Sequence, residues 1–282
     1  MLRNKLMRVG TTLALAAMIG TAVPASAMAS TVKLAGSTSL QPLAQLWATA
    51  FHKANPSISV SVAGGGSGAG FSAAKSGSVD IGMSSKTVAD SDSAAQLTPV
   101  ARDAVAVIVN PKNNVRVLTP DIIKGIYTGK YKTWKSVGGK THGKFNANHA
   151  IVLDGRTGAS GTYDYFKTSI MGGSSQSNKT KTYASNGMVR SAVSRDPYGI
   201  GYLSLAYINK SVMGIAIAPA AGKKGIAPTK SNSLSGKYPY VRYLYFVNYA
   251  AHARSSAAQA FVNYCLSSKG QKIAASEDLP LH

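Results

Sequence analysis

Residues 154–162 read Asp154-Gly155-Arg156-Thr157-Gly158-Ala159-Ser160-Gly161-Thr162 and follow the apolar run 151–153, which predicts a strand. A helix is predicted to begin after this stretch, with Ser160 or Thr162 as its cap. The free N–H groups of a helix start and the planar guanidinium of Arg156 both suit a small tetrahedral anion. The plain alternative is a glycine-rich surface turn with an exposed arginine. Either way, the stretch defines a strand–turn–helix unit that can be sought elsewhere in the chain.

Three earlier parts of the chain have a similar order of strand, hydroxyl-bearing turn and helix or polar segment. The turns carry Thr38 and Ser39, Ser67, and Ser85, after strands predicted at 31–35, 58–62 and 79–83. In open α/β sheets, ligands bind at the carboxyl ends of the strands. We therefore expect all four turns to surround one ligand.

The glycine-rich loop at 64–70 does not fit the named glycine-rich motifs. Ala69 and Phe71 interrupt the dinucleotide spacing G-x-G-x-x-G, and Ala69 also breaks the hydrolase pattern G-x-S-x-G. A phosphate-binding P-loop ending at 139–141 is excluded because Trp134 stands where its first glycine should be. Two interpretations stay open: a plain tight turn, or free amides and Ser67 presented at a helix start.

The rest of the chain alternates predicted strands, helices and loops. Strands are predicted at 100–109, 199–203 and 238–247, a capped helix beginning at Thr119, a loop at 219–235 and a final helix at 255–275. The aromatic residues of the strand at 238–247 are expected in the core. Cys265 lies on the apolar face of the final helix, so we expect its thiol to be buried.

The amino terminus has the pattern of a secretory signal peptide. A basic start through Arg8 is followed by an apolar run and by A-x-A cleavage options after Ala27 or Ala29. Residues 1–29 are therefore predicted to be a signal peptide of an exported, soluble protein. Cys265 is the single cysteine and lies far from the cleavage position, so we expect no lipid anchor and no intrachain disulfide. The lack of a lipid-accepting cysteine favours the periplasm as the location.

The composition is strongly basic. The formal net charge is +21, from 31 Lys and Arg against 10 Asp and Glu. Loss of residues 1–29 would leave +18, because three basic residues and no acid lie there. Such a protein attracts anions. Glu277 is the only glutamate, so chemistry with paired carboxylates has few candidates. The basic residues are scattered, which fits a general positive field better than a nucleic-acid tract.

With these residues laid out, the chain resembles the phosphate-binding protein of bacterial high-affinity phosphate ABC transporters, in its short form. The matching pieces run in family order: 36–43, 64–70, 80–85, 118–134 with 138–139, 156–162, 200–202, 238–239 and 242–245. The resemblance implies an α/β fold, the two-lobed type II periplasmic binding protein with crossing strands at the hinge. It implies that lobe one comprises 30–99 and 240–282, that lobe two comprises 100–239, and that an anion is bound in the cleft between them.

The family's anion contacts, carried across by position, fall on the four turns. They are Thr38, the amide of Ser39, Ser67, Ser85, Arg156, Ser160, Gly161 and Thr162. Ser85 is a departure, because some family members place there an aspartate that accepts the phosphate proton and repels sulfate. Our hypothesis for this acceptor is Asp103, with Asp154 and Asp164 as second choices. Thr157 and Lys86 also depart from the family, which has an acid and an arginine at those positions in many members.

The resemblance implies a binding protein and not an enzyme. It would receive inorganic phosphate in the periplasm and deliver it, as a monomer that binds no nucleic acid, to ABC transporter permease subunits at the inner membrane. We predict no catalytic residue, metal or cofactor, since none of the five histidines lies in the four turns. Three alternatives stay open: a secreted phosphatase or serine hydrolase, a binding protein for another tetrahedral oxyanion such as sulfate or molybdate, and a cationic protein that binds envelope polyanions.

Overall fold

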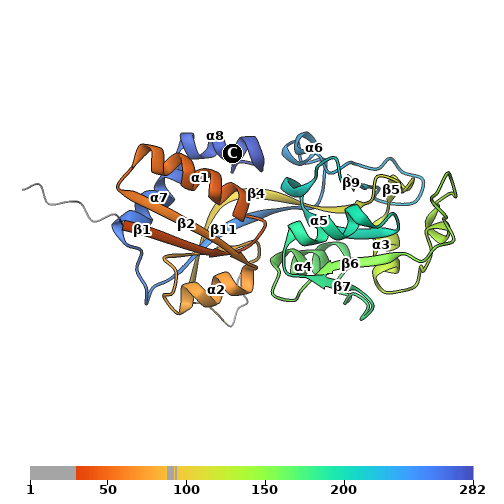
Figure 1. Ribbon diagram of the computed structural model, residues 1–282, viewed down its shortest axis with the longest axis horizontal. Coiled ribbons are helices and arrows are strands. Elements are labelled where there is room, and N and C mark those ends of the chain that lie inside the picture. The colour runs from red at the N-terminus through yellow and green to blue at the C-terminus, as the bar shows by residue number, and fades with distance from the viewer. Residues whose placement is uncertain (1–29, 88–91, 93, 282) are drawn as a thin grey trace, which may run out of the picture.

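The computed structural model describes residues 30–87, 92 and 94–281, so the predicted signal peptide at 1–29 lies outside the described residues. Two lobes lie next to each other along the long axis and are joined by two long strands (Figure 1). One hydrophobic core contains Trp47 and Phe261, and the other contains Tyr127 and Tyr202. The predicted α/β fold with two lobes and crossing strands is confirmed.

The first lobe consists of three parallel strands with helices on both faces. Its elements are β1 (Ser30–Gly36), α1 (Gln41–Ala54), β2 (Ile58–Gly65), α2 (Ser67–Lys75), β3 (Ile81–Ser84), α7 (Ser256–Leu266) and α8 (Ser268–Glu277). β1 pairs in parallel with β2 on one side and with β3 on the other. The turns that follow these three strands therefore leave the sheet at the same edge.

The second lobe contains shorter elements. They are β5 (Val117–Leu118), α3 (Pro120–Tyr127), β6 (Val152–Arg156), α4 (Gly161–Tyr165), β7 (Lys181–Tyr183), α5 (Asn186–Arg195), β8 (Gly199–Ser204), β9 (Met213–Gly214), β10 (Ala216–Ile217) and α6 (Lys230–Leu234). β6 pairs in parallel with both β7 and β8. In the core behind these strands, the rings of Phe166 and Tyr202 are stacked with centroids 3.8 Å apart. The buried rings give β6 a fixed support for the residues that follow it.

Two long strands, β4 (Ala95–Val109) and β11 (Val241–Tyr249), pass from one lobe to the other (Figure 1). They pair antiparallel, while β11 also pairs with β3 and β4 also pairs with β8. The sheet thus continues through both lobes in the order β2-β1-β3-β11-β4-β8-β6-β7. On β4, Ala101 packs in the first core and Ala104 packs in the second. The crossing point therefore lies near Asp103, which faces Arg242 in the strand register.

The single final helix predicted at 255–275 is wrong, because the chain breaks at Ser267 into α7 and α8. Ser267 has an extended backbone and caps α8, since its Oγ accepts a hydrogen bond from the N–H of Gly270 at 3.3 Å. Gly270 packs so closely on the end of α7 that a Cβ there would lie 2.2 Å from the carbonyl oxygen of Tyr264. The indole of Trp47 donates to the carbonyl oxygen of Gly270 at 2.8 Å, which ties the bend to α1.

The loop predicted at 219–235 is also wrong at its end, where the structure has α6. Thr229 caps this helix, because its Oγ1 accepts a hydrogen bond from the N–H of Asn232 at 3.2 Å. A helix of one turn is too short to show a helical spacing of apolar residues, so only the cap could have indicated it.

The prediction that the aromatic residues of 238–247 lie in the core holds only in part. The strand begins at Val241 and not at Tyr238, and within it Phe246 is buried, whereas 48% of the surface of Tyr243 is exposed. Successive side chains of a strand point to opposite faces, so aromatic character alone does not decide burial. Cys265 is fully buried, as predicted. Among the helices within residues 30–87 and 94–281, none has both the length and the apolar character needed to cross a membrane.

Candidate anion-binding site

The four predicted turns meet where the two lobes face each other, at the carboxyl ends of β1, β2, β3 and β6. The hydroxyl of Ser39 in the first lobe lies 3.1 Å from the hydroxyl of Thr162 in the second. The hydroxyls of Ser67 and Ser85 lie 3.2 Å apart. These side chains are at most 2% exposed. The structure therefore brings the predicted turns into one buried polar cluster.

Ser160 and Gly161 allow the second-lobe turn to approach the first lobe. Ser160 is the cap of α4, because its Oγ accepts from the N–H of Thr162 at 3.1 Å. Gly161 comes next, and a Cβ on it would lie 2.6 Å from the Oγ of Ser85 and 2.7 Å from the Oγ of Ser67. A side chain at position 161 would therefore push the two lobes apart at this point.

Arg156, the arginine predicted for the site, is only 1% exposed. Its Nη2 donates across the interface to Thr38 Oγ1 at 3.2 Å, and its Nη1 donates to Asn186 Oδ1 at 2.7 Å. Its Nε donates to the carbonyl oxygen of Tyr183 at 3.2 Å. Burial, with the charge of Arg242 as the second cause, lowers the pKa of Arg156 to about 10. The guanidinium therefore stays charged near neutral pH.

A second buried guanidinium belongs to Arg242 on β11, which was not among the predicted site residues. Its Nη2 donates to Ser39 Oγ and to Thr162 Oγ1, both at 2.9 Å. Its Nη1 donates to the carbonyl oxygens of Ser85 at 3.3 Å and Gly161 at 3.0 Å. Arg242 thus contacts turns from both lobes at the point where β11 crosses between them.

Asp103 holds Arg242 in this position. Its Oδ2 accepts from Arg242 Nη2 at 2.8 Å and from Arg242 Nε at 3.1 Å. Its Oδ1 accepts from the hydroxyl of Ser204 at 2.8 Å. The carboxylate is fully buried. The geometry therefore gives Asp103 a clear structural task, the orientation of a guanidinium that itself reaches the turns.

The second-choice acceptors, Asp154 and Asp164, are held by other groups. Asp164 forms an ion pair with Lys86 at 2.9 Å, and both side chains are about one-third exposed. Asp154 Oδ1 accepts from the hydroxyl of Tyr183 at 3.1 Å, and its Oδ2 has no partner among the described residues. Burial raises the pKa of Asp154 to about 6. Of the three carboxylates, only Asp103 binds an arginine, Arg242, that also donates hydrogen bonds to the predicted turns.

Two more residues join the cluster without having been predicted. Asn186, at the start of α5, donates through Nδ2 to Thr38 Oγ1 and Ser39 Oγ, both at 3.1 Å. The hydroxyl of Tyr207 donates to the carbonyl oxygen of Thr38 at 2.7 Å. Asn186 follows Ser185, the cap of α5, and so stands in a strand–turn–helix unit like the four predicted turns, whereas the sequence around Tyr207 has no such pattern. Arg242 had a signal, a charged residue inside an otherwise apolar and aromatic strand.

The charge of the buried cluster is positive. The cluster contains two guanidiniums, Arg156 and Arg242, and one carboxylate, Asp103, which pairs with Arg242. Asp278 is buried nearby, and burial together with the charge of Asp103 raises its pKa well above the ordinary value, which favours its neutral form. A buried cluster with excess positive charge and many hydroxyl groups is chemically suited to an anion.

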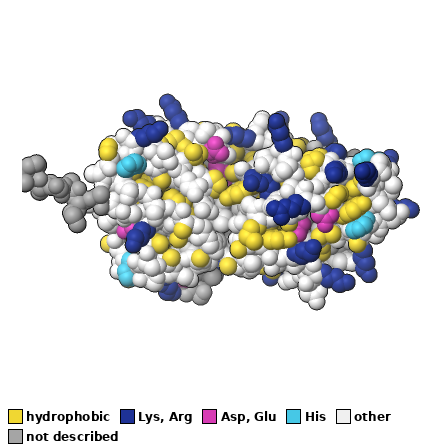
Figure 2. Space-filling view, viewed as in Figure 1, with side chains coloured by type: hydrophobic (Ala, Val, Ile, Leu, Met, Phe, Trp, Pro, Cys, Tyr) yellow, Lys and Arg dark blue, Asp and Glu magenta, His cyan; other side chains and the backbone are white. Residues whose placement is uncertain are grey.

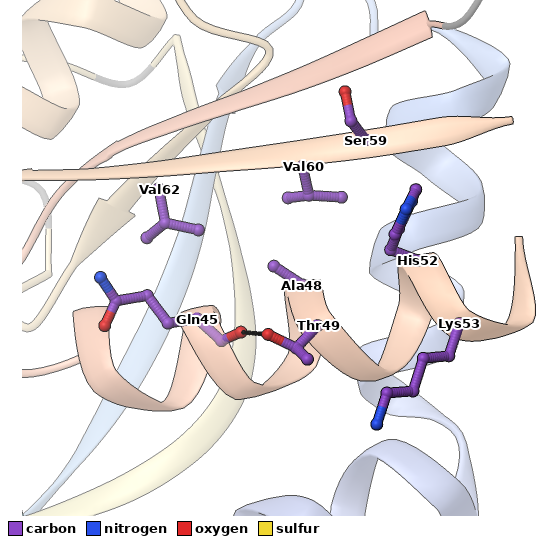
Figure 3. Close-up of a pocket in the computed structure, with 8 residues that line it drawn as sticks. All are labelled: Gln45, Ala48, Thr49, His52, Lys53, Ser59, Val60 and Val62. Carbon is purple, nitrogen blue, oxygen red and sulfur yellow. Dashed lines mark hydrogen bonds between the residues drawn. The ribbon is translucent and has the colours of Figure 1, made fainter. Parts of the chain in front are cut away.

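One hollow adjoins this cluster, and another lies on the first lobe away from it. A cavity of about 480 Å³ adjoins its outer side and is lined by Ser85, Gly161, Arg242 and others. A separate groove of about 470 Å³ lies on the first lobe between α1 and β2, where Val60 and Val62 point toward the helix (Figure 3). This groove contains none of the predicted site residues, so only the first hollow belongs with the polar cluster.

Comparison with known proteins shows the family to which the chain belongs. The model of the PBP superfamily domain matches residues 21–269. The phosphate-binding protein PstS of Bacillus subtilis is 30% identical over 245 residues, which cover 85% of this chain and 76% of that protein. The chain belongs to this family of phosphate-binding proteins. A second member, PstS of Pseudomonas aeruginosa, is 29% identical over 88% of this chain and 82% of its own length.

A crystal structure from the same family gives the match in three dimensions. It is a phosphate ABC transporter substrate-binding protein from Clostridium perfringens with bound phosphate. Its sequence is 30% identical, its TM-score is 0.79, and the match covers 89% of this chain and 98% of that one. The predicted fold of a type II periplasmic binding protein is thereby confirmed, and the family is one of substrate-binding proteins.

Proposed function

We propose that this protein binds inorganic phosphate in the buried cluster between its lobes and delivers it to an ABC permease at the inner membrane. The observation that carries the proposal is the position of two buried guanidiniums among four hydroxyl-bearing turns from both lobes. Membership of the phosphate-binding family, and the phosphate held by its C. perfringens member, support phosphate as the anion.

The proposed contacts combine hydroxyls, amides and a guanidinium. They are Thr38, the amide of Ser39, Ser67, Ser85, Arg156, Ser160, Gly161 and Thr162. Hydroxyl groups rotate and can donate or accept, so those that now pair with one another can turn toward phosphate oxygens. Hydrogen bonds to a charged partner contribute roughly 1.5–3 kcal/mol each, and neutral ones contribute less. Arg156 adds a planar fork that fits two oxygens of one phosphate.

We propose that the lobes open and close about the point where β4 and β11 cross. A phosphate that touches both lobes binds the closed arrangement better and therefore favours it. The proposed lobe boundaries, at 99/100 and 239/240, lie within a few residues of the Asp103–Arg242 pair. Leu279, near the carboxyl end, packs in the second core, so the last residues also span the two lobes.

Asp103 has two proposed tasks in this scheme. The first is to orient Arg242, which its hydrogen bonds support. The second is to accept the proton of bound phosphate, which would separate phosphate from sulfate because sulfate has no proton to give. A carboxylate oxygen has more than one lone pair, so the bond from Ser204 to Oδ1 leaves room for this contact.

We further propose that the mature protein works in the periplasm as a monomer, after loss of residues 1–29 and without a lipid anchor. The signal-peptide pattern and the position of the single cysteine support this proposal. We expect no catalysis, since the cluster of described residues around Arg156 contains no histidine that could act as a base for a serine.

Calorimetric titration with phosphate, arsenate, sulfate and molybdate tests the function. We expect tight 1:1 binding of phosphate and arsenate, weaker binding of the other two anions, and no turnover of a phosphate ester. Absence of heat with every small anion would reject the proposal. Ester turnover, lost on substitution of Ser160, would instead support the phosphatase alternative.

A further inference from the structure

A further cavity lies in the second lobe, apart from the anion cluster. It has a volume of about 530 Å³ and lies between the end of α3, the first half of β6 and the segment that leads into β7. None of the proposed phosphate contacts lines it, and Arg156 lies at the other end of β6. Cavities that hold small organic molecules in proteins have volumes of roughly 300–1,000 Å³. The size therefore suits a small organic ligand.

The wall of this cavity is apolar. Ile126 and Leu153 are buried, and Ile151 and Tyr131 are half-buried. The ring of Tyr131 lies directly on α3, because a Cβ on Gly125 would come within 2.5 Å of a carbon of that ring. The glycine thus fixes the position of the aromatic wall. An apolar ligand group placed here would replace water contacts with side-chain contacts, which favours binding.

Lysines border the same cavity. Lys132, Lys179 and Lys181 line it and are themselves exposed, and no acidic residue is among its lining residues. Ser177, in the segment that carries Lys179, is anchored by a bond of 2.7 Å from its N–H to the carbonyl oxygen of Tyr127. Lys179 is therefore attached to a segment that is itself fixed to α3.

The charge of the whole lobe acts in the same direction. Residues 100–239 contain 20 Lys and Arg and 5 Asp, whereas 30–99 and 240–282 together contain 8 Lys and Arg and 5 acids. Figure 2 shows basic side chains spread over the second lobe with few acidic ones between them. A field of one sign raises the local concentration of ligands of the opposite sign.

We propose that this cavity binds an amphipathic organic anion. Its apolar part, an aromatic ring system or a short acyl chain, lies against Tyr131, Ile151 and Leu153. Its carboxylate, sulfonate or phosphate group lies at the edge, near Lys132, Lys179 and Lys181. The site is independent of the phosphate cluster, so both can be occupied together.

Fluorescence titration with 1-anilinonaphthalene-8-sulfonate tests the proposal, with saturating phosphate present throughout. We expect saturable 1:1 binding that decanoate displaces and that sulfate at equal ionic strength does not. The triple variant K132E/K179E/K181E should bind the probe at least tenfold more weakly. The matched control K210E/K223E/K224E changes the charge of the same lobe equally at exposed lysines outside the cavity. It should bind within twofold of the wild type.

The apolar wall is tested by Tyr131→Ser, with circular dichroism and a phosphate titration to show that the fold is kept. We expect at least a fivefold loss of probe affinity with phosphate affinity unchanged. Equal probe affinity in the two triple variants, or displacement by sulfate as effective as by decanoate, would overturn the proposal. If the wild type did not bind phosphate at all, this would contradict only the proposed function, because the cavity shares no residue with the phosphate site.

Discussion

Arg242 and Asp103 form the contact on which both lobes converge. The two residues are separated by 139 positions in sequence and are direct partners in the β4–β11 register. Their ion pair is buried, and removal of one partner from such a pair typically costs roughly 3–5 kcal/mol, because an unpaired charge is left behind. The same guanidinium reaches Ser39 and Thr162. Stability and, under the proposed function, the arrangement of the anion-binding turns therefore both involve the Arg242 side chain.

Arg156→Ala is expected to weaken phosphate binding by two to four orders of magnitude. The reason is the loss of two charge-assisted hydrogen bonds, which together contribute roughly 3–6 kcal/mol. Calorimetric titration measures the change, with Arg195→Ala as the control because Arg195 is exposed at the end of α5. Equal affinities of the two variants would show that the arginine has been assigned to the wrong role.

Asp103→Asn is expected to reduce the preference for phosphate over sulfate by about tenfold, which corresponds to roughly 1.4 kcal/mol for the lost acceptor of the phosphate proton. The variant should also unfold at lower urea concentration, because Arg242 loses its charged partner. Titration with both anions measures the first effect. Asp121→Asn, on the exposed side of α3, is the control. If a folded Asp103→Asn protein kept the wild-type selectivity, the acceptor role would be discarded and only the orienting role would stay.

Most of the site residues that the sequence predicted stand in turns directly after strands. Thr38, Ser67, Ser85 and Ser160 stand in short turns after strands, so their convergence followed from the rule for open α/β sheets. Asn186 also follows a parallel strand, β7, but this strand has only three residues and shows no alternation of apolar and polar residues, so the same rule was not applied to it. The pairing of Arg242 with Asp103 could not be predicted, because it depends on the register between β4 and β11.

The position of the short helix α4 depends on the two residues at its start, Ser160 and Gly161. Ser160 caps it and Gly161 gives the close approach to the first lobe. β4 and β11 join the strands of the two lobes into one continuous sheet. The turn is thus held in place by its own cap, by the strands that cross and by the absence of a side chain at 161.

Gly161→Ala is expected to reduce phosphate affinity by at least tenfold while leaving the fold intact. The added Cβ would lie 2.6 Å from Ser85 Oγ and 2.7 Å from Ser67 Oγ, so closure of the lobes would require these groups to move. Gly158→Ala is a matched control in the same turn, since a Cβ there meets nothing within 4 Å. Calorimetry and circular dichroism measure affinity and fold. Similar affinity in both variants would contradict the proposed packing of the closed state.

Element boundaries were predictable where a cap or a break is visible in the sequence. Thr119 marked the start of α3 correctly, since its Oγ1 accepts from the N–H of Ile122. The apolar face at 255–266 continued far enough to suggest one long helix, and the break at Ser267 was missed. That break has local signals, the Ser267 cap and Gly270 packed against Tyr264, and is held in addition by the tertiary hydrogen bond from Trp47 to Gly270.

For the whole molecule, the basic charge is concentrated in residues 100–239, where 20 basic residues face 5 acids. This distribution was not evident until the chain was divided into lobes. It leaves the first lobe nearly balanced and makes the second attractive to anions over its surface. The long-range field and the short-range contacts of the cluster therefore act together on an approaching anion.

The stability of the whole protein is expected to depend on pH through Asp154. Burial raises its pKa from an ordinary 3.8 to about 6, so the folded state holds a proton that the unfolded state has already released. Stability is then lost as the pH rises from about 4 through about 6, and the loss is complete above that range.

The substitution Asp154→Asn should remove this dependence of stability on pH. Thermal unfolding from pH 4 to pH 8 measures it, with Asp121→Asn as the exposed control. A constant difference in melting temperature between the wild type and Asp154→Asn across this range would show that burial does not shift the group.

The convergence of the four turns on one anion can be observed in a crystal structure with arsenate, in which anomalous scattering locates the arsenic atom. Arsenate has the shape and charge of phosphate, so it marks the position of the anion. We expect one strong arsenic peak between the lobes, with the arsenate oxygens about 3 Å from the Arg156 guanidinium and from the hydroxyls of Thr38, Ser67 and Ser160. A fully occupied peak elsewhere, with this cluster unchanged and still closed on itself, would contradict it.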